Sequence, residues 1–373
     1  MFTHSVRLFD IFGFEIRIDA SWLVIAALIV WSLSQGYIPS VLPEVEPGTA
    51  LILAVIAMLG LFGSLVLHEL AHSLVARRYG LSVGRITLFL FGGVAELEDE
   101  PRSAVSEFWI AVAGPAMSFA LAGVFGLLSL VAGEGEAGLL VGYLATINLV
   151  LGGFNLIPAF PLDGGRVLRA LLWQRSGDVL SATRVASLAG SGLALALMAL
   201  GLFSVLSGGG LGGVWIGLIG LFVLSASRGA YQQMAMRHGL RGRRVADLMT
   251  REAHVAHPAA SLRDLAERVM LTRGVSFVPV VEAGRLLGHV DTEALRAVPR
   301  EEWDARVVAD ILVPLSAETA LAPTASAETA LAAMMAGGRR KYLVAEGARL
   351  AGVLSLSDLL AQVRVLQELE QPG

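Results

Sequence analysis

Two histidines and a glutamate lie within five positions of one another in an apolar part of this chain. The order is His68, Glu69, Leu70, Ala71 and His72, with apolar runs before and after it. On a helix, positions i and i+4 lie about 40° apart, so His68 and His72 would present two imidazoles on one face, one turn apart. Two such nitrogens can share one zinc ion, and Glu69 is placed to take a proton from a water molecule that the metal activates. The motif therefore predicts metal-dependent hydrolysis.

The composition places much of the chain in a lipid bilayer. Hydrophobic residues make up 55% of the chain, charged residues make up 16%, and the mean hydropathy is +0.68, which excludes an ordinary soluble domain. An ionisable side chain in a transmembrane helix costs about 3 kcal/mol or more and is functional by default. The chain has no cysteine, so any zinc must be held by histidine and carboxylate. A net charge of −4 without basic clusters indicates no nucleic-acid partner.

Six apolar stretches approach or exceed the roughly 20 residues that a spanning helix needs. They cover residues 22–35, 50–76, 108–131, 139–156, 185–206 and 211–224. Arginines occur in the connections 77–102, 166–184 and 228–244, whereas the alternate connections 36–49, 132–138 and 207–213 have none. Because cytoplasmic connections carry the basic residues, the sequence predicts a multi-pass protein of the cell membrane with both termini in the cytoplasm.

A third zinc ligand is needed, because two histidines leave a catalytic zinc short of its usual three protein ligands. The best candidate is Asp163, in the segment 155–165 that ends the fourth span, where prolines and paired glycines break the helix and can line a polar cavity. The second and fourth spans both run inward, so His72 and Asp163 should both approach the cytoplasmic side. The alternative is that Asp163 only caps a short helix that begins near Gly164.

The segment 88–97 follows the metal motif and is too short to span. Aromatic and β-branched residues surround Gly92 and Gly93, with Phe91 before them, which predicts a hairpin that enters the membrane beside the metal. A substrate helix must unwind before it can be cleaved, and pairing with the edge of such a hairpin would satisfy its exposed backbone. A purely structural hairpin is the alternative.

The composition becomes that of a soluble protein from about residue 243, and a pattern then repeats. Residues 245–249 open one unit and residues 308–312 the next, while residues 285–290 are echoed by 349–354. A repeat of roughly 60 residues with a strand-helix-strand-strand-helix order indicates two copies of one small α/β module.

These repeats resemble a pair of cystathionine-β-synthase (CBS) domains, which often bind adenine nucleotides in the cleft between them. Ser355 and Asp358 are similar to that family's ribose-phosphate pattern, whereas Ala294 stands at the aspartate position of the first copy. The resemblance implies one site for ATP or AMP and a homodimer through the CBS domains. A pair that only dimerises the protein is the alternative.

The membrane part resembles the site-2 protease family of intramembrane zinc metalloproteases. The resemblance rests on the His-Glu-x-x-His motif, on the sequence Ala-Gly-Pro at 113–115 and on the segment 155–165. It implies one Zn²⁺ per chain held by His68, His72 and Asp163, with Glu69 as general base. It also implies that Asn155 holds the substrate or its oxyanion.

The sequence thus predicts a polytopic α-helical membrane protein, with six transmembrane helices and a short membrane-associated β-hairpin, plus a cytoplasmic α/β CBS domain pair. The expected segments are amphipathic strands at 1–20 that turn near residues 12 and 13, a zinc protease domain at 21–230, a linker at 231–243 and CBS domains at 244–300 and 305–366.

The predicted function is regulated intramembrane proteolysis, in which a peptide bond in the transmembrane segment of another protein is hydrolysed in the bilayer and adenine nucleotide acts as a regulator. The alternative is a CBS-gated transporter of a divalent cation. Glu69 favours the protease, since a transit site has no need for a carboxylate outside its ligand set. A catalytically dead scaffold is disfavoured because His68, Glu69, His72 and Asp163 are all present.

Overall fold

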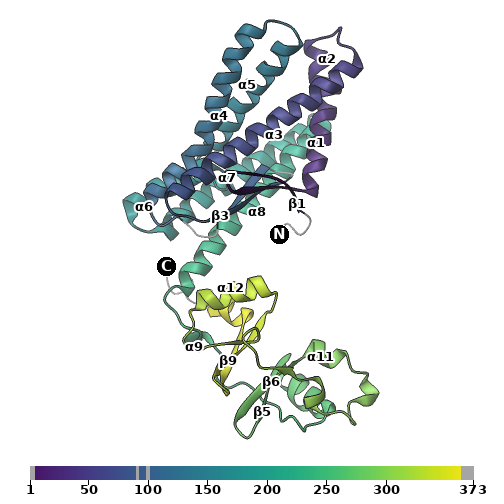
Figure 1. Ribbon diagram of the computed structural model, residues 1–373, viewed down its shortest axis with the longest axis vertical. Coiled ribbons are helices and arrows are strands. Elements are labelled where there is room, and N and C mark those ends of the chain that lie inside the picture. Colours follow the sequence, from purple (N-terminus) through teal and green to yellow (C-terminus); the bar gives the residue numbers. More distant parts are fainter. Residues whose placement is uncertain (1–4, 90–91, 98–100, 363–373) are drawn as a thin grey trace. The chain divides into compact units, whose positions relative to one another are not determined.

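The structure is a computed structural model that describes residues 5–89, 92–97 and 101–362 (Figure 1). The chain divides into two compact units, a membrane unit of Met1–Gln232 and a C-terminal unit of Gln233–Gly373. Each unit has its own hydrophobic cores. The two units are described separately below.

Six segments of the described chain are long and apolar enough to cross a membrane. The first is built from α1 (Ala20–Ser32), a π-helical turn (Leu33–Tyr37) and α2 (Ile38–Val41). The others are α3 (Pro47–Arg78), α4 (Ala104–Ala132), α5 (Glu136–Asn155), α7 (Val179–Leu206) and α8 (Gly210–Leu240). The six predicted spans are confirmed, and most helices run past the apolar stretches because no helix-breaking residue stops them at the end of the apolar sequence.

Figure 1 shows α3, α4 and α5 side by side, and α4 contacts both α3 and α5. A shorter helix, α6 (Asp163–Ser176), is too short to span and packs against α4 and α7. It ends at Gly177, whose φ of +72° is the left-handed conformation that commonly terminates helices. Its packing against α4 and α7 therefore places α6 beside the helix bundle.

A four-stranded sheet lies at the same end of the membrane unit as α6 (Figure 1). Its strands are β1 (Ser5–Ile11), β2 (Phe14–Asp19), β3 (Val83–Phe89) and β4 (Gly92–Leu97), in that spatial order. Phe12 and Gly13, both at positive φ, turn the chain between β1 and β2, and β2 then pairs in parallel with β3. The N-terminal strands and the predicted hairpin are therefore parts of one sheet, a pairing between distant segments that local sequence patterns do not reveal.

The sheet is fixed to the helix that carries the metal motif. Phe14 and Ile16 of β2 and Ile86 of β3 are buried in one cluster with Val66 and Leu70 of α3. Val66 and Leu70 flank His68 along the chain, so burial of these apolar side chains holds the sheet beside the motif.

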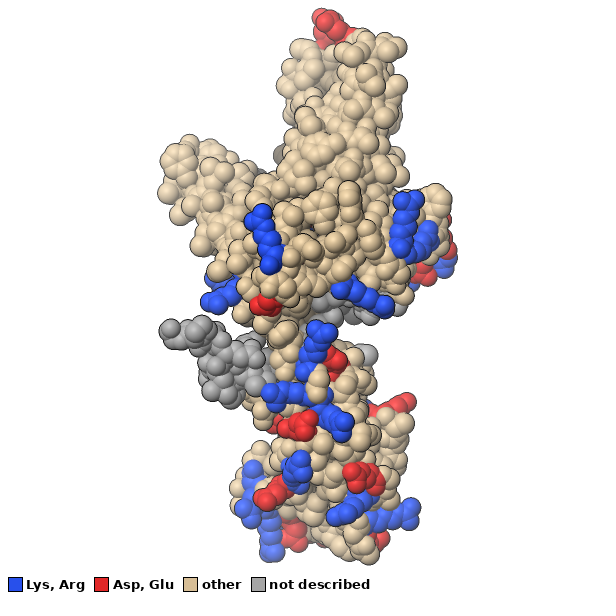
Figure 2. All heavy atoms as spheres, turned by 90° about the vertical axis from the view of Figure 1, so that its left-hand side faces the viewer, with Lys and Arg blue, Asp and Glu red and all other residues tan. Residues whose placement is uncertain are grey.

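The surface of the membrane unit has an uncharged belt on the face drawn in Figure 2. On that face basic side chains, with some acidic ones, gather at one end, acidic side chains lie at the opposite end, and the surface between the two ends is free of charge. An uncharged belt of this kind suits the hydrocarbon core of a bilayer.

The C-terminal unit contains two three-stranded sheets. In one sheet the order is β5 (Phe277–Glu282), β6 (Arg285–Asp291) and β7 (Val313–Pro314), the last of which follows the opening segment of the second repeat. In the other sheet it is β10 (Arg349–Ser355), β9 (Lys341–Glu346) and β8 (Ala320–Leu321). The helices are α9 (Val245–Leu248), α10 (Leu262–Asp264) with a π-helical continuation (Leu265–Leu271), α11 (Thr292–Arg296) and α12 (Ala327–Gly337).

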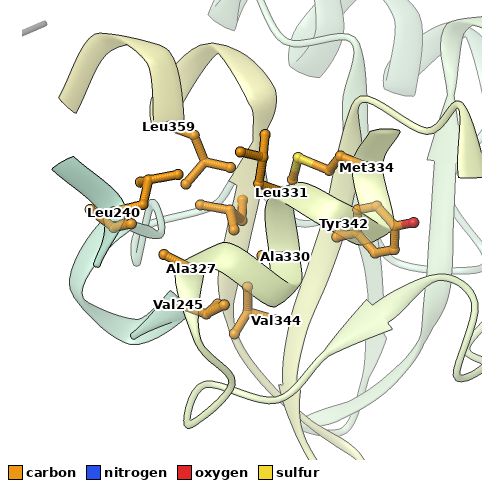
Figure 3. Close-up of a cluster of buried hydrophobic side chains, with 11 residues drawn as sticks. Leu240, Val245, Ala327, Ala330, Leu331, Met334, Tyr342, Val344 and Leu359 are labelled. Atoms are coloured by element: carbon orange, nitrogen blue, oxygen red, sulfur yellow. The ribbon is translucent and has the colours of Figure 1, made fainter. Parts of the chain in front are cut away.

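The two repeats exchange their opening segments. Leu240 precedes the first repeat and Val245 opens it, yet both are buried with Leu331 and Val344 of the second (Figure 3). In the same way Val308, which opens the second repeat, is buried in the core of the first. Each core therefore depends on both repeats, which sequence similarity between the repeats does not show.

Candidate metal centre

The metal motif lies in the C-terminal third of α3, where His68 and His72 are 2% and 6% exposed. Asp163, the first residue of α6, places its Oδ2 3.2 Å from His68 Nε2 and 3.1 Å from His72 Nε2. The two Nε2 atoms are 3.2 Å apart. Two residues from one helix and one from another, about 90 positions further along the chain, therefore form a compact triangle of donor atoms.

The triangle has the chemistry and size of a catalytic zinc site. Donors that surround one tetrahedral zinc at about 2.0–2.1 Å lie about 3.3–3.4 Å from each other, a few tenths of an ångström more than the separations found here. Two imidazoles and one carboxylate also leave the fourth position open, as catalytic zinc requires. The donor set fits a zinc ion with only a small outward adjustment.

Asp163 faces the histidines rather than capping its helix. The N-cap of α6 is Leu162, which makes no side-chain hydrogen bond there. Burial disfavours the charged carboxylate, but the neighbouring imidazoles of His72 and His68 outweigh it and hold the pKa of Asp163 below its ordinary value. The aspartate is thus kept in the ionised form that binds metals.

Glu69 lies beside the triangle and against the edge strand β4. A Cβ atom at Gly93 would lie 2.5 Å from Glu69 Cγ, so any other residue at this point of the strand would require the Glu69 side chain to move. Gly92 begins β4 and pairs with Phe89 of β3, while Phe91 lies outside the described residues. The sheet edge and the proposed base are therefore direct neighbours.

A cavity of about 560 Å³ opens at this site. His68, Glu69, His72 and Asp163 line it together with Asn155, the last residue of α5. Apolar side chains complete the wall, including Ile25 of α1, Phe89 of β3, Leu151 of α5, and Trp215 and Phe222 of α8. An apolar cavity with a few convergent polar groups is typical of an active site.

Helix α4 contacts the rear of both imidazoles. His72 Nδ1 donates a hydrogen bond of 2.6 Å to the carbonyl oxygen of Ile110, and His68 Nδ1 lies 2.9 Å from the hydroxyl oxygen of Ser118. Gly114 lies between these two positions, and a Cβ there would be 2.2 Å from His72 Nε2 and 2.5 Å from His68 Nε2. In the sequence Gly114 is visible only as part of the Ala-Gly-Pro motif, and no local pattern marks Ile110 or Ser118.

Relatives of this chain run along its full length. The protein named "Putative zinc metalloprotease Rip3" from Mycobacterium tuberculosis is 38% identical over 378 aligned residues, which cover 99% of this chain and 95% of that protein. The chain belongs to peptidase family M50. The model of that family matches residues 56–135 and 132–199, and the CBS domain model matches residues 245–300.

Other relatives of this M50 peptidase include "Zinc metalloprotease MJ0392" from Methanocaldococcus jannaschii, which is 30% identical over 99% of this chain and 98% of that protein. The solved structure of "Site-2 Protease from Methanocaldococcus jannaschii" is 34% identical, covers 61% of this chain and 95% of that chain, and gives a TM-score of 0.45. The predicted family, the predicted class of membrane zinc metallopeptidase and the predicted fold class are confirmed. The two full-length relatives are named zinc metalloproteases rather than transporters.

A buried ion pair holds α6, and with it Asp163, against α4 of the M50 peptidase. Glu107 of α4 is fully buried, and its Oε1 accepts hydrogen bonds from Nε, at 2.7 Å, and Nη2 of Arg169. Arg166 Nε lies 3.9 Å from the same oxygen, and the Arg169 guanidinium also covers the ring of Phe160. In the sequence these arginines contributed only to the predicted membrane orientation, because local patterns do not show that Glu107 is buried beside them.

Proposed function

We propose that this M50 peptidase is an intramembrane endopeptidase that hydrolyses a peptide bond in the transmembrane segment of another membrane protein. The observation that carries the proposal is the triangle of His68, His72 and Asp163, which lies beside Glu69 in a cavity of the membrane unit. His68, His72 and Asp163 would hold one zinc ion. Zinc in this position supplies Lewis-acid polarisation of the scissile carbonyl and acidifies a water molecule.

Glu69 acts as the general base and then as the general acid. Its carboxylate accepts a proton from the attacking water and returns it to the nitrogen of the leaving amine. It lies one residue after His68 and outside the triangle of donor atoms, so it is free to move a proton. Asn155 lines the same cavity and is proposed to donate a hydrogen bond to the substrate carbonyl or to the oxyanion that forms from it.

The substrate segment is proposed to bind in extended form along β4. A peptide bond in an intact helix has its carbonyl engaged, so the helix must unwind before attack, and its freed backbone groups then need partners in the bilayer. In the described sheet β4 pairs with β3 on one side only, and Gly93 brings it against Glu69. Addition of the substrate as a further strand at Gly92 and Gly93 would satisfy its backbone and place the scissile bond near the base.

The direct test compares Glu69→Gln with the wild-type enzyme. The variant keeps the size of the side chain and removes the proton acceptor, so zinc content should stay at one per chain while cleavage of a reconstituted membrane substrate is abolished. His68→Ala and Asp163→Ala should lose zinc as well as cleavage. Retained cleavage by Glu69→Gln would refute the assignment of the base.

The C-terminal unit is proposed to bind ATP or AMP beside Ser355 and Asp358. The backbone N–H of Ser355 donates to Asp358 Oδ2 at 3.0 Å, and the N–H of Asp358 donates to Ser355 Oγ at 3.1 Å. These reciprocal bonds hold the start of the helix at residues 356–362, where backbone groups suit a phosphate. Nucleotide titration of the cleavage rate, with Asp358→Ala as the control, tests both binding and regulation.

The C-terminal unit is also proposed to join two copies of the chain. Light scattering in detergent, which measures the mass of the particle, tests this proposal.

Both termini are proposed to lie in the cytoplasm. Because the chain has no cysteine, single cysteines can report the topology. A cysteine at Glu134, in an arginine-free connection, should react with an impermeant thiol reagent in intact cells. A cysteine at Gln174, in an arginine-bearing connection, should react only after permeabilisation, and the opposite pattern would invert the proposed orientation.

A further inference from the structure

One face of α4 is built around the two imidazoles of α3. Ile110, Gly114 and Ser118 are spaced four residues apart, so they lie in one row along the helix. Ile110 and Ser118 contact the Nδ1 atoms of His72 and His68, and Gly114 faces both Nε2 atoms. The row thus contacts both Nδ1 atoms and leaves no space for a side chain beside the two Nε2 atoms.

The partner of Nδ1 decides whether Nε2 can bind a metal. A neutral imidazole carries its proton on one nitrogen only, so Nε2 offers a lone pair when Nδ1 holds the proton. The carbonyl of Ile110 can only accept a hydrogen bond, which keeps the proton of His72 on Nδ1. A hydroxyl can donate or accept, so Ser118 is the adjustable partner of the pair.

The Ser118 hydroxyl contacts His68 and is shielded from bulk water. It is 0% exposed, His68 is 2% exposed, and the two side chains meet at 2.9 Å across the α3–α4 interface. Without this hydroxyl the Nδ1–H group of His68 would be buried without an acceptor, and the tautomer protonated on Nε2 would gain population. That tautomer presents a hydrogen where the metal needs a lone pair.

We propose that Ser118 is a positioning residue that sets zinc affinity: its hydroxyl oxygen accepts a hydrogen bond from the Nδ1–H of His68, which keeps the proton on Nδ1 and leaves Nε2 free. The inference rests on the proposed role of His68 as a zinc ligand. Ser118 is proposed to contact His68 alone and to touch neither the metal nor the substrate. Its substitution should therefore change the affinity for zinc directly and the rate of cleavage only through the loss of zinc.

The test measures zinc affinity of the purified full-length enzyme by competition with a chelator after removal and return of the metal. Ser118→Ala should bind zinc 10- to 100-fold more weakly. Ser118→Thr keeps the hydroxyl and should stay near the wild-type value. The matched control is Ser187→Ala, which removes another buried hydroxyl, on α7, whose oxygen has no partner among the described residues, and which should leave zinc affinity unchanged.

A spectroscopic readout separates positioning from general loosening of the bundle. Cobalt in place of zinc should show a shifted visible absorption band in Ser118→Ala but not in Ser118→Thr, while the thermal midpoint of both metal-free variants stays near that of the wild type. Unchanged zinc affinity in Ser118→Ala, or equal loss in both variants, overturns the inference. His68→Ala separates failure of the proposed ligand set from failure of the proposed role of Ser118. If His68→Ala binds zinc normally, the ligand set is wrong. If His68→Ala loses zinc and Ser118→Ala does not, only the role of Ser118 is wrong.

Discussion

Replacing Gly114 by alanine should remove zinc from the enzyme while leaving the fold in place. The added Cβ would lie 2.2 Å from His72 Nε2 and 2.5 Å from His68 Nε2. Ordinary contacts between such atoms are about 3.5 Å, so an imidazole or α4 must move by about 1 Å or more. Zinc ligands tolerate deviations of only about 0.2 Å, so a shift of this size breaks the triangle with Asp163.

The cost to the fold is much smaller than the cost to the site. Overpacking of a core by one methyl group typically costs about 1–3 kcal/mol, and alanine recovers about 1 kcal/mol of helix propensity relative to glycine. Helix content by circular dichroism should therefore be unchanged, whereas zinc measured by mass spectrometry should fall from one per chain to near zero.

Two glycines on the same helix provide matched controls. Cβ atoms at Gly123 and Gly126 of α4 would meet nothing within 4 Å, so alanine at either position should keep wild-type zinc content and cleavage. A Gly114→Ala enzyme that holds one zinc per chain and cleaves normally would refute the placement of α4 against the two imidazoles.

Three further predictions concern other parts of the chain. Glu107→Ala leaves Arg169 buried without its partner and should destabilise the membrane unit by about 3–5 kcal/mol, seen as a lower thermal midpoint; an unchanged midpoint contradicts the anchoring role. Gly93→Val should displace Glu69 and abolish cleavage with zinc retained, and full activity would disprove the contact between β4 and the base. Burial lowers the pKa of His289, whose ring nitrogens have no hydrogen-bond partner in the described part of the chain, despite an opposing effect of Asp291. Because the unfolded state then binds the proton more tightly, stability of the first repeat should fall as pH drops below about 6.5, measured by amide exchange in β5 and β6, and His289→Phe should remove this dependence.

The meeting of the three residues proposed to hold the metal could be predicted from the sequence, because their signals are local or topological. His68 and His72 follow from helical spacing alone. Asp163 follows from the number of ligands that zinc needs and from the direction of two spans, and the structure brings its carboxylate to the histidines. Local spacing, charge and hydropathy are sufficient for these parts of the site.

The surroundings of the ligands could not be predicted, because they depend on which distant segments touch. The hydroxyl of Ser118 and the space at Gly114 acquire meaning only once α4 lies on α3. The parallel pairing of β2 with β3 likewise joins residues about 70 positions apart. Val245 and Val308 are each buried in the core of the other repeat, which the sequence of one repeat alone does not show.

His68, His72 and Asp163 are proposed to hold the catalytic zinc, and zinc K-edge X-ray absorption of the purified enzyme reports the ligands of the metal themselves. We expect two imidazole nitrogens and one carboxylate oxygen at about 2.0–2.1 Å in the wild type. We also expect loss of the metal in Asp163→Ala. A wild-type spectrum with a different number of imidazoles, or an Asp163→Ala enzyme with full zinc and the same spectrum, would contradict this ligand set.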